Sequence, residues 1–169
     1  MNDMMKVAAI IADAGGRVVG RTRLQKIAYL LCVAGLEDGF SFSYKHYGPF
    51  SEDLAAAARI GKLFGQLRVT ESPTTWGGSY SIYDVDAGPT ADSPESRRLL
   101  AKVAAEADAI ELELAATAVF LAKDGFSDPW GETARRKPEK VDYGRLDRAK
   151  DLLRSLSSIP TPERLPEIV

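Results

Sequence analysis

The sequence has very few of the side chains that metal and redox sites require. Among 169 residues there is one cysteine, Cys32, and one histidine, His46. One cysteine excludes an intramolecular disulfide and a cysteine-based zinc site, and one histidine excludes the His-Glu-x-x-His pattern of zinc proteases. We therefore expect no metal and no cofactor. The cytoplasm, where disulfides are rare, is the expected localisation.

Long apolar runs and phosphate-binding loops are missing as well. No stretch of about 18 apolar residues occurs, so we expect no membrane-spanning segment. The residues before Val7 contain no long apolar core and no small-residue cleavage site, which argues against a secretory signal. The pairs Gly15-Gly16 and Gly77-Gly78 lack the lysine and hydroxyl residues, or the strand-to-helix context, of a phosphate loop.

No pattern of reactive groups indicates catalysis. Cys32 falls within an apolar helical pattern, where a free cysteine acts as a small hydrophobic residue. Glu111 and Glu113 project to different sides of a predicted helix, so they do not form an acid–base pair. We predict a non-enzymatic protein without catalytic residues.

The composition itself is that of an ordinary globular protein. Apolar residues make up 45% and charged residues 27% of the chain, and the length suits one domain. We predict a single compact domain over 1–169, with a first half at 1–88, a helical half at 93–156 and a proline-rich tail at 157–169. The net charge of −2 disfavours a protein that coats nucleic acid.

The first half alternates helical patterns with short β-rich runs. Apolar residues recur at helical spacing, and cap residues such as Asn2, Thr22 and Ser51 precede them. The predicted order is a helix 3–14, a connector 18–20, a helix 22–33, an extended arm 40–47, a turn 47–50, a helix 51–65 and a hairpin of 67–70 with 80–85. This is the order of a winged helix-turn-helix domain.

The second half is helical throughout. A helix is predicted from Pro94, its first residue, to about 123, with a break near Ala107-Asp108. A short helix follows Asp128 and ends before Pro138, and 142–156 forms the last helix. Trp130 is expected beneath the last helices. The predicted fold class is therefore mainly α (α+β): a winged-helix-like N-terminal half with a β-hairpin, followed by a C-terminal helical half packed on it.

Two strings in the first half are the most specific features of the sequence. They are Gly20-Arg21-Thr22-Arg23-Leu24-Gln25-Lys26-Ile27-Ala28-Tyr29 and Tyr47-Gly48-Pro49-Phe50-Ser51-Glu52-Asp53-Leu54. A Leu-x-Lys-Ile-x-Tyr helix followed by a Gly-Pro turn resembles the SocA-like, or Panacea, antitoxin-domain family and its YwgA-like branch. The resemblance covers about residues 15–65 and, more weakly, 110–155 with its Lys137-Pro138 pair. It implies a mostly helical, non-enzymatic protein that binds and neutralises a toxin-like partner protein. The long hairpin with Trp76 departs from the family pattern.

The residues of these strings also suggest a binding surface. Aromatic and cationic side chains are frequent interface anchors, and we expect the start of the second helix and the aromatic arm to converge on one groove. The candidate partner-binding residues are Arg21, Arg23, Gln25, Lys26, Tyr29, His46, Tyr47, Gly48 and Pro49. Core packing is an equal alternative to partner binding for Lys26 and Tyr29. For Gly48 and Pro49, turn geometry alone is a sufficient explanation. A homodimer is compatible with this hypothesis, and no membrane partner is expected.

A DNA-binding transcriptional regulator is the alternative function. The predicted helix 51–65 would then enter the major groove, but Glu52 and Asp53 lie at its start and the run 55–58 is all alanine. Contact with nucleic acid is one interpretation of Arg135-Arg136-Lys137, and the other is that a helix C-terminus favours cations. Protein binding is therefore the preferred hypothesis.

Overall fold

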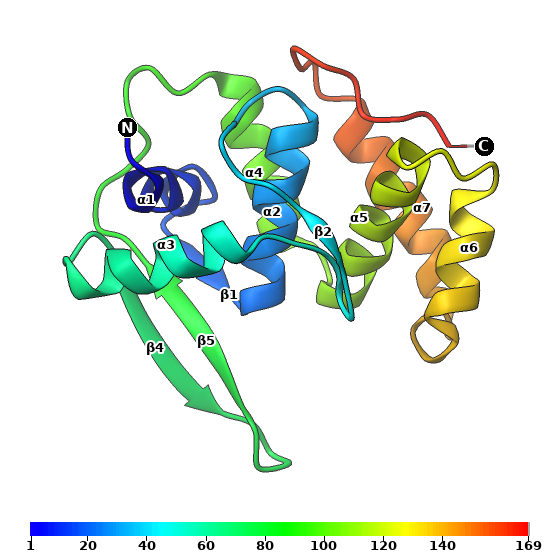
Figure 1. Ribbon diagram of the computed structural model, residues 1–169, viewed down its shortest axis with the longest axis horizontal. Helices are drawn as coiled ribbons and strands as arrows, with labels where there is room; N and C mark the ends of the chain where they lie inside the picture. Colours follow the sequence, from blue (N-terminus) through cyan, green and yellow to red (C-terminus); the bar gives the residue numbers. More distant parts are fainter. Residues whose placement is uncertain (169) are drawn as a thin grey trace.

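A computed structural model describes residues 1–168 as a mainly helical α+β protein with small antiparallel sheets in its N-terminal half (Figure 1). Within this range lie seven α-helices, five strands and one 3-10 helix. In chain order they are α1 (Asp3–Asp13), β1 (Arg17–Val19), α2 (Arg21–Val33), β2 (Ser43–Lys45), β3 (Gly48–Phe50), α3 (Glu52–Leu63), β4 (Arg68–Pro73), β5 (Ser79–Asp84), α4 (Glu95–Glu106), α5 (Ala109–Lys123), α6 (Pro129–Arg136), η1 (Pro138–Lys140) and α7 (Arg145–Ser157).

The helix starts follow the capping signals with two corrections. The Asn2 side chain accepts a hydrogen bond from Met5 N, and the Ser51 hydroxyl accepts one from Leu54 N, as the sequence predicts. The predicted cap Thr22 is wrong, because α2 begins at Arg21 and its N-cap is Gly20, at φ 103°. Pro94 precedes α4 as its N-cap instead of being its first residue.

The first sheet has the order β1-β5-β4 and is antiparallel throughout. The predicted hairpin is confirmed as β4 and β5, in register from Arg68 opposite Asp84 to Pro73 opposite Ser79. The residues predicted as a connector form β1 instead, because Val18 is buried and β1 pairs with the far edge of β5. The β4–β5 hairpin projects away from the helices (Figure 1), and Trp76 near its tip is 88% exposed.

The second sheet is the short β2–β3 hairpin. The sequence predicts an extended arm followed by a turn at 47–50, but the chain turns at His46-Tyr47, and Gly48 and Pro49 belong to β3. Figure 1 places this hairpin between the N-terminal helices and the α5–α6 pair. Its strand β3 contacts both α2 and α5. The aromatic arm is therefore clamped between the two halves of the molecule.

The C-terminal helices pack together around α5. The predicted break before α5 is confirmed, and the Asp108 carboxylate caps the helix by accepting from Ile110 N and Glu111 N. Residues 112–119 of α5 are all buried, because α5 packs against α2, α6 and α7. Trp130 is 5% exposed and lies in the same core, as predicted. In the tail, Glu163 N donates to the Ala34 carbonyl.

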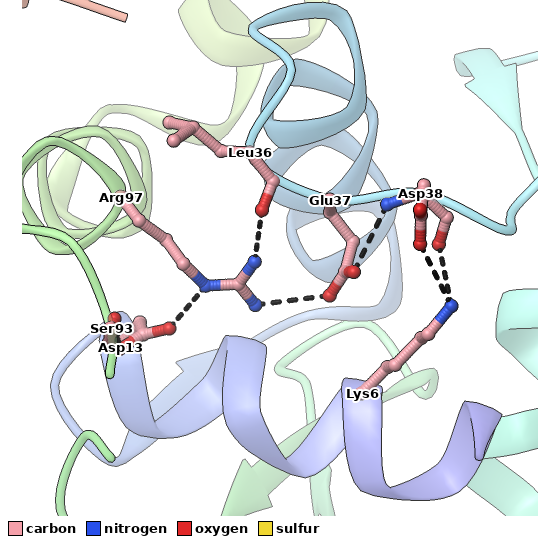
Figure 2. A network of polar contacts seen from close by, with 7 residues as sticks. All are labelled: Lys6, Asp13, Leu36, Glu37, Asp38, Ser93 and Arg97. Atoms are coloured by element: carbon pink, nitrogen blue, oxygen red, sulfur yellow. Dashed lines mark hydrogen bonds and ion pairs between the residues drawn. The ribbon is translucent and has the colours of Figure 1, made fainter. Parts of the chain in front are cut away.

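A buried arginine connects α4 to α1 and to the loop that follows α2 (Figure 2). Arg97 donates from Nε to the Asp13 carboxylate and from its amino groups to the Leu36 carbonyl and to Glu37 Oε1. Ser93 Oγ donates to the second Asp13 oxygen at 2.7 Å. Arg97 and Asp13 are both buried, so this ion pair belongs to the structural core.

Candidate functional site

Two motif residues on α2 hold the end of the β2–β3 hairpin by its backbone. Gln25 Oε1 accepts from Ser51 N at 2.8 Å, and its Nε2 donates to Ser51 O at 3.0 Å. Lys26 Nζ donates to the Pro49 carbonyl at 2.9 Å. Both side chains are buried, with Lys26 only 1% exposed. These polar groups are satisfied by the main chain, and their role is to position β3 and the start of α3.

The opposite side of the hairpin is held from the C-terminal half. Lys137, just after α6, donates from Nζ to the His46 carbonyl at 2.8 Å and pairs with Glu113 at 3.0 Å. Lys140 donates to both Glu113 oxygens, at 2.8 and 2.7 Å. Glu113 and Lys137 are buried, so the loss of one partner would leave a buried charge without its counterion, which is costly.

Gly48 is required at its position by both conformation and space. Its φ of +92° lies in the region that disfavours side chains. A Cβ there would lie 2.5 Å from Thr117 Oγ1. Thr117 is fully buried and its hydroxyl has no hydrogen-bond partner among the described residues. The hairpin therefore packs directly on α5 without a polar contact at this point.

Burial shifts the pKa values of three side chains on α2. Desolvation is the main reason that the pKa of Lys26 is lowered to about 8; Glu113 opposes this shift, and the charges of Lys137 and Lys140 contribute to it. Desolvation raises the pKa of Tyr29 above its ordinary value and that of Cys32 to about 12. Tyr29 packs edge-on against Phe42 with the ring centroids 5.1 Å apart.

The two arginines at the start of α2 donate their hydrogen bonds to elements other than the β2–β3 hairpin. Arg23 donates to the Val19 carbonyl and to the carbonyls at the end of α4, those of Ala105 and Ala107 among them, and so acts as a C-terminal cap. Arg21 donates to Ser81 Oγ at 3.2 Å and lines a cleft of about 400 Å³ between α2, α3 and the β4–β5 hairpin. The predicted convergence on one groove does not occur, because this cleft is separate from the one that His46 and Tyr47 line.

His46 and Tyr47 open onto the feature that we name the hairpin groove, a concave surface of about 640 Å³. It is lined by Tyr44, His46, Tyr47, Arg136, Lys137, Glu139 and Lys140. The Arg136 guanidinium lies 4.8 Å from the centre of the Tyr44 ring, and Lys140 Nζ lies 4.7 Å from that of Tyr47. These cation–π contacts fix both rings and both cations.

The predicted site residues thus divide into two groups. Arg21, His46 and Tyr47 are exposed and Arg23 is partly buried, whereas Gln25, Lys26, Tyr29, Gly48 and Pro49 are buried. Arg136 and Lys140, which supply cations of the hairpin groove, are not among the predicted partner-binding residues. The signal for them in the sequence is the basic run that begins at Arg135.

Comparison with family models, with curated proteins and with solved structures finds no match. Within residues 1–168, no helix is long and apolar enough to cross a membrane. The same range contains no group of three or more histidine, cysteine, aspartate or glutamate side chains that could hold a metal ion.

Proposed function

We propose that this protein is a non-enzymatic binding module that engages a toxin-like partner protein through the hairpin groove. The observation that carries the proposal is the mounting of the β2–β3 hairpin. Lys26 and Lys137 bond two of its carbonyls from opposite sides, while His46 and Tyr47 at its turn remain exposed. A rigid exposed loop loses little entropy when it binds, which favours affinity.

The side chains of the groove suit a protein interface. Tyr47 is 55% exposed and stacks under Lys140, so it offers a large apolar surface with a polar rim. Tyrosine and arginine are enriched among the residues that contribute most to binding energy. The resemblance of the Gln25-Lys26 and Gly48-Pro49 strings to the SocA-like antitoxin domain supports the same function.

We also propose that the N-terminal half is a winged-helix variant. Its three helices precede the β4–β5 hairpin, and the sheet order β1-β5-β4 brings the short first strand beside the hairpin. In this interpretation α3 is the second helix of the helix-turn-helix pair and β4–β5 is the wing. The β2–β3 hairpin is then an insertion between α2 and α3.

DNA binding is the second candidate function, and the winged-helix order favours it. The charges of the expected contact surface oppose it. Glu52 and Asp53 are exposed at the start of α3, where phosphates would approach. On the wing, Arg68 pairs with Asp86 at 2.8 Å, and the exposed tip at Trp76 carries no cation. The partner-protein function is therefore preferred.

The function is tested by affinity capture from a lysate of the source cells, with and without nuclease. Tagged wild type is compared with Tyr47→Ala, which removes an exposed ring, and with Arg59→Gln/Lys62→Gln, which neutralises the exposed cations of α3. The proposal expects one partner protein that resists nuclease, is lost with Tyr47→Ala and is retained with the α3 variant. Recovery of nucleic acid that is lost only in the α3 variant would support the DNA-binding function instead.

A further inference from the structure

The cations around the hairpin groove outnumber the carboxylates that neutralise them. Glu113 pairs with both Lys137 and Lys140, and Glu132 pairs with both Arg135 and Arg136. Each of these two carboxylates pairs with two cations, which leaves two positive charges, and the exposed Glu139 on the rim of the groove offsets one of them. This local excess contrasts with the net charge of −2 for the whole chain.

The side chains of Arg136 and Lys140 are held in place and remain partly exposed. Arg136 donates from Nε to Glu132 at 2.7 Å, and among residues 1–168 its two terminal amino groups bond no carboxylate. A guanidinium has five N–H donors, so donors remain for another acceptor beyond those that face Glu132 and Tyr44. The side chains of Arg136 and Lys140 are 29% and 21% exposed. Both lie over tyrosine rings that restrict their motion.

We propose that the hairpin groove binds an acidic segment of the partner protein. One aspartate or glutamate carboxylate of that segment accepts from Arg136 and Lys140, and an adjoining apolar group lies on the exposed ring of Tyr47. This step rests on the proposed function and specifies the chemistry of the partner. A carboxylate is favoured because a charge-assisted pair with a partly buried arginine is stronger than a neutral hydrogen bond.

The arrangement fits a short acidic peptide better than a nucleic-acid backbone. A nucleic-acid strand presents regularly spaced phosphates and requires a continuous row of cations. Here three cations line the groove, and the exposed Glu139 lies on its rim. A peptide with separated carboxylates avoids that acid, whereas a phosphate backbone would be repelled by it.

The test selects random phage-displayed dodecapeptides on the full-length wild-type protein. Selected peptides are then measured by fluorescence polarisation against Arg136→Gln/Lys140→Gln and against the charge-matched control Arg59→Gln/Lys62→Gln. The groove variant keeps Arg135 on Glu132 and Lys137 on Glu113, so neither carboxylate loses its last cation. We expect enrichment of aspartate and glutamate, at least tenfold weaker binding to the groove variant and unchanged binding to the control.

Several results would overturn the proposal. They are peptides without acidic enrichment, no enrichment at all, or equal loss of affinity in both double variants. A fourth is that a fluorescent 20-nucleotide single-stranded DNA binds the groove more tightly than the acidic peptides do. Melting temperatures are measured for every variant. If the groove variant unfolds, Tyr47→Ala, which leaves the ion pairs intact, replaces it in the binding measurement. Non-acidic peptides that bind the wild type and lose affinity with Tyr47→Ala would refute the acidic chemistry while leaving the proposed function intact.

Discussion

Replacement of Lys26 by methionine tests whether the lysine under the hairpin carries an electrostatic cost. Lys26 is 1% exposed, and within residues 1–168 its ammonium makes one hydrogen bond, to the Pro49 carbonyl. Three charged groups act on it from neighbouring elements: Glu113 favours its charged form, and Lys137 and Lys140 oppose it. Burial is the largest influence and lowers its pKa from 10.5 to about 8. Methionine fills a similar volume without a charge.

The sign of the pH dependence follows from proton binding. Between pH 8 and 10.5 the unfolded chain holds a proton on Lys26 that the folded chain has released, so the stability of the wild type rises with pH. At 1.36 kcal/mol per pKa unit, the difference between 10.5 and about 8 corresponds to about 3 kcal/mol, most of it between pH 7 and 10. Below pH 8 this contribution is constant, because both states are then protonated.

The assay is urea unfolding of wild type and Lys26→Met at pH 7 and pH 10. The variant leaves the Pro49 carbonyl without its donor, which costs about 1–3 kcal/mol at either pH. Tyr29 and Cys32 have raised pKa values and lower the alkaline stability of both proteins alike. The wild type should therefore gain about 2–3 kcal/mol relative to the variant from pH 7 to 10. An equal difference between the two proteins at both pH values would refute the reasoning.

Three further substitutions test the packing of the hairpin and of the core. Gly48→Ala should lower the free energy of unfolding in urea by about 3 kcal/mol, because of the positive φ and the contact with Thr117 Oγ1. Gly65→Ala, at a positive φ with open space around it, measures the backbone contribution alone. Equal losses of stability in the two variants would contradict the contact. Thr117→Val should leave stability unchanged or raise it by about 1 kcal/mol, because the hydroxyl has no partner within the described residues, and a loss above about 1 kcal/mol would point to a bond. Arg97→Met should lower stability by about 3–5 kcal/mol by leaving Asp13 buried without its cation, and a change under about 1 kcal/mol would show that the pair is dispensable.

Local signals predicted the helices, although the starts of α2 and α4 needed correction. Ser51 and Asp108 both cap the helix that follows them, and the break before α5 coincides with the second of these. Such signals act over a few residues, so they can be identified in the sequence. The β1 strand shows the opposite case. Three residues form a strand only because β5, more than sixty residues later, supplies the hydrogen bonds.

The candidate site illustrates the same limit more strongly. Lys26 and Lys137 are 111 positions apart, yet both bond carbonyls of one hairpin. A buried lysine and an exposed lysine are the same letter in a sequence, and only the tertiary fold distinguishes them. The sequence pattern therefore suggested partner contacts for Gln25 and Lys26, whereas both side chains bond the backbone of the chain itself.

This difference changes what the motif resemblance implies. The residues that carry it, chiefly Gln25, Lys26, Gly48 and Pro49, are buried and build the mounting of the β2–β3 hairpin. Such residues are constrained by the hairpin geometry and are compatible with many partners. The residues that would discriminate among partners are then those that the mounting presents, Tyr47 and the cations of the hairpin groove. A chain that shares the motif but differs at these exposed positions should keep the hairpin and bind a different partner. Exchanging the exposed residues between two such chains should therefore exchange the partners that they bind.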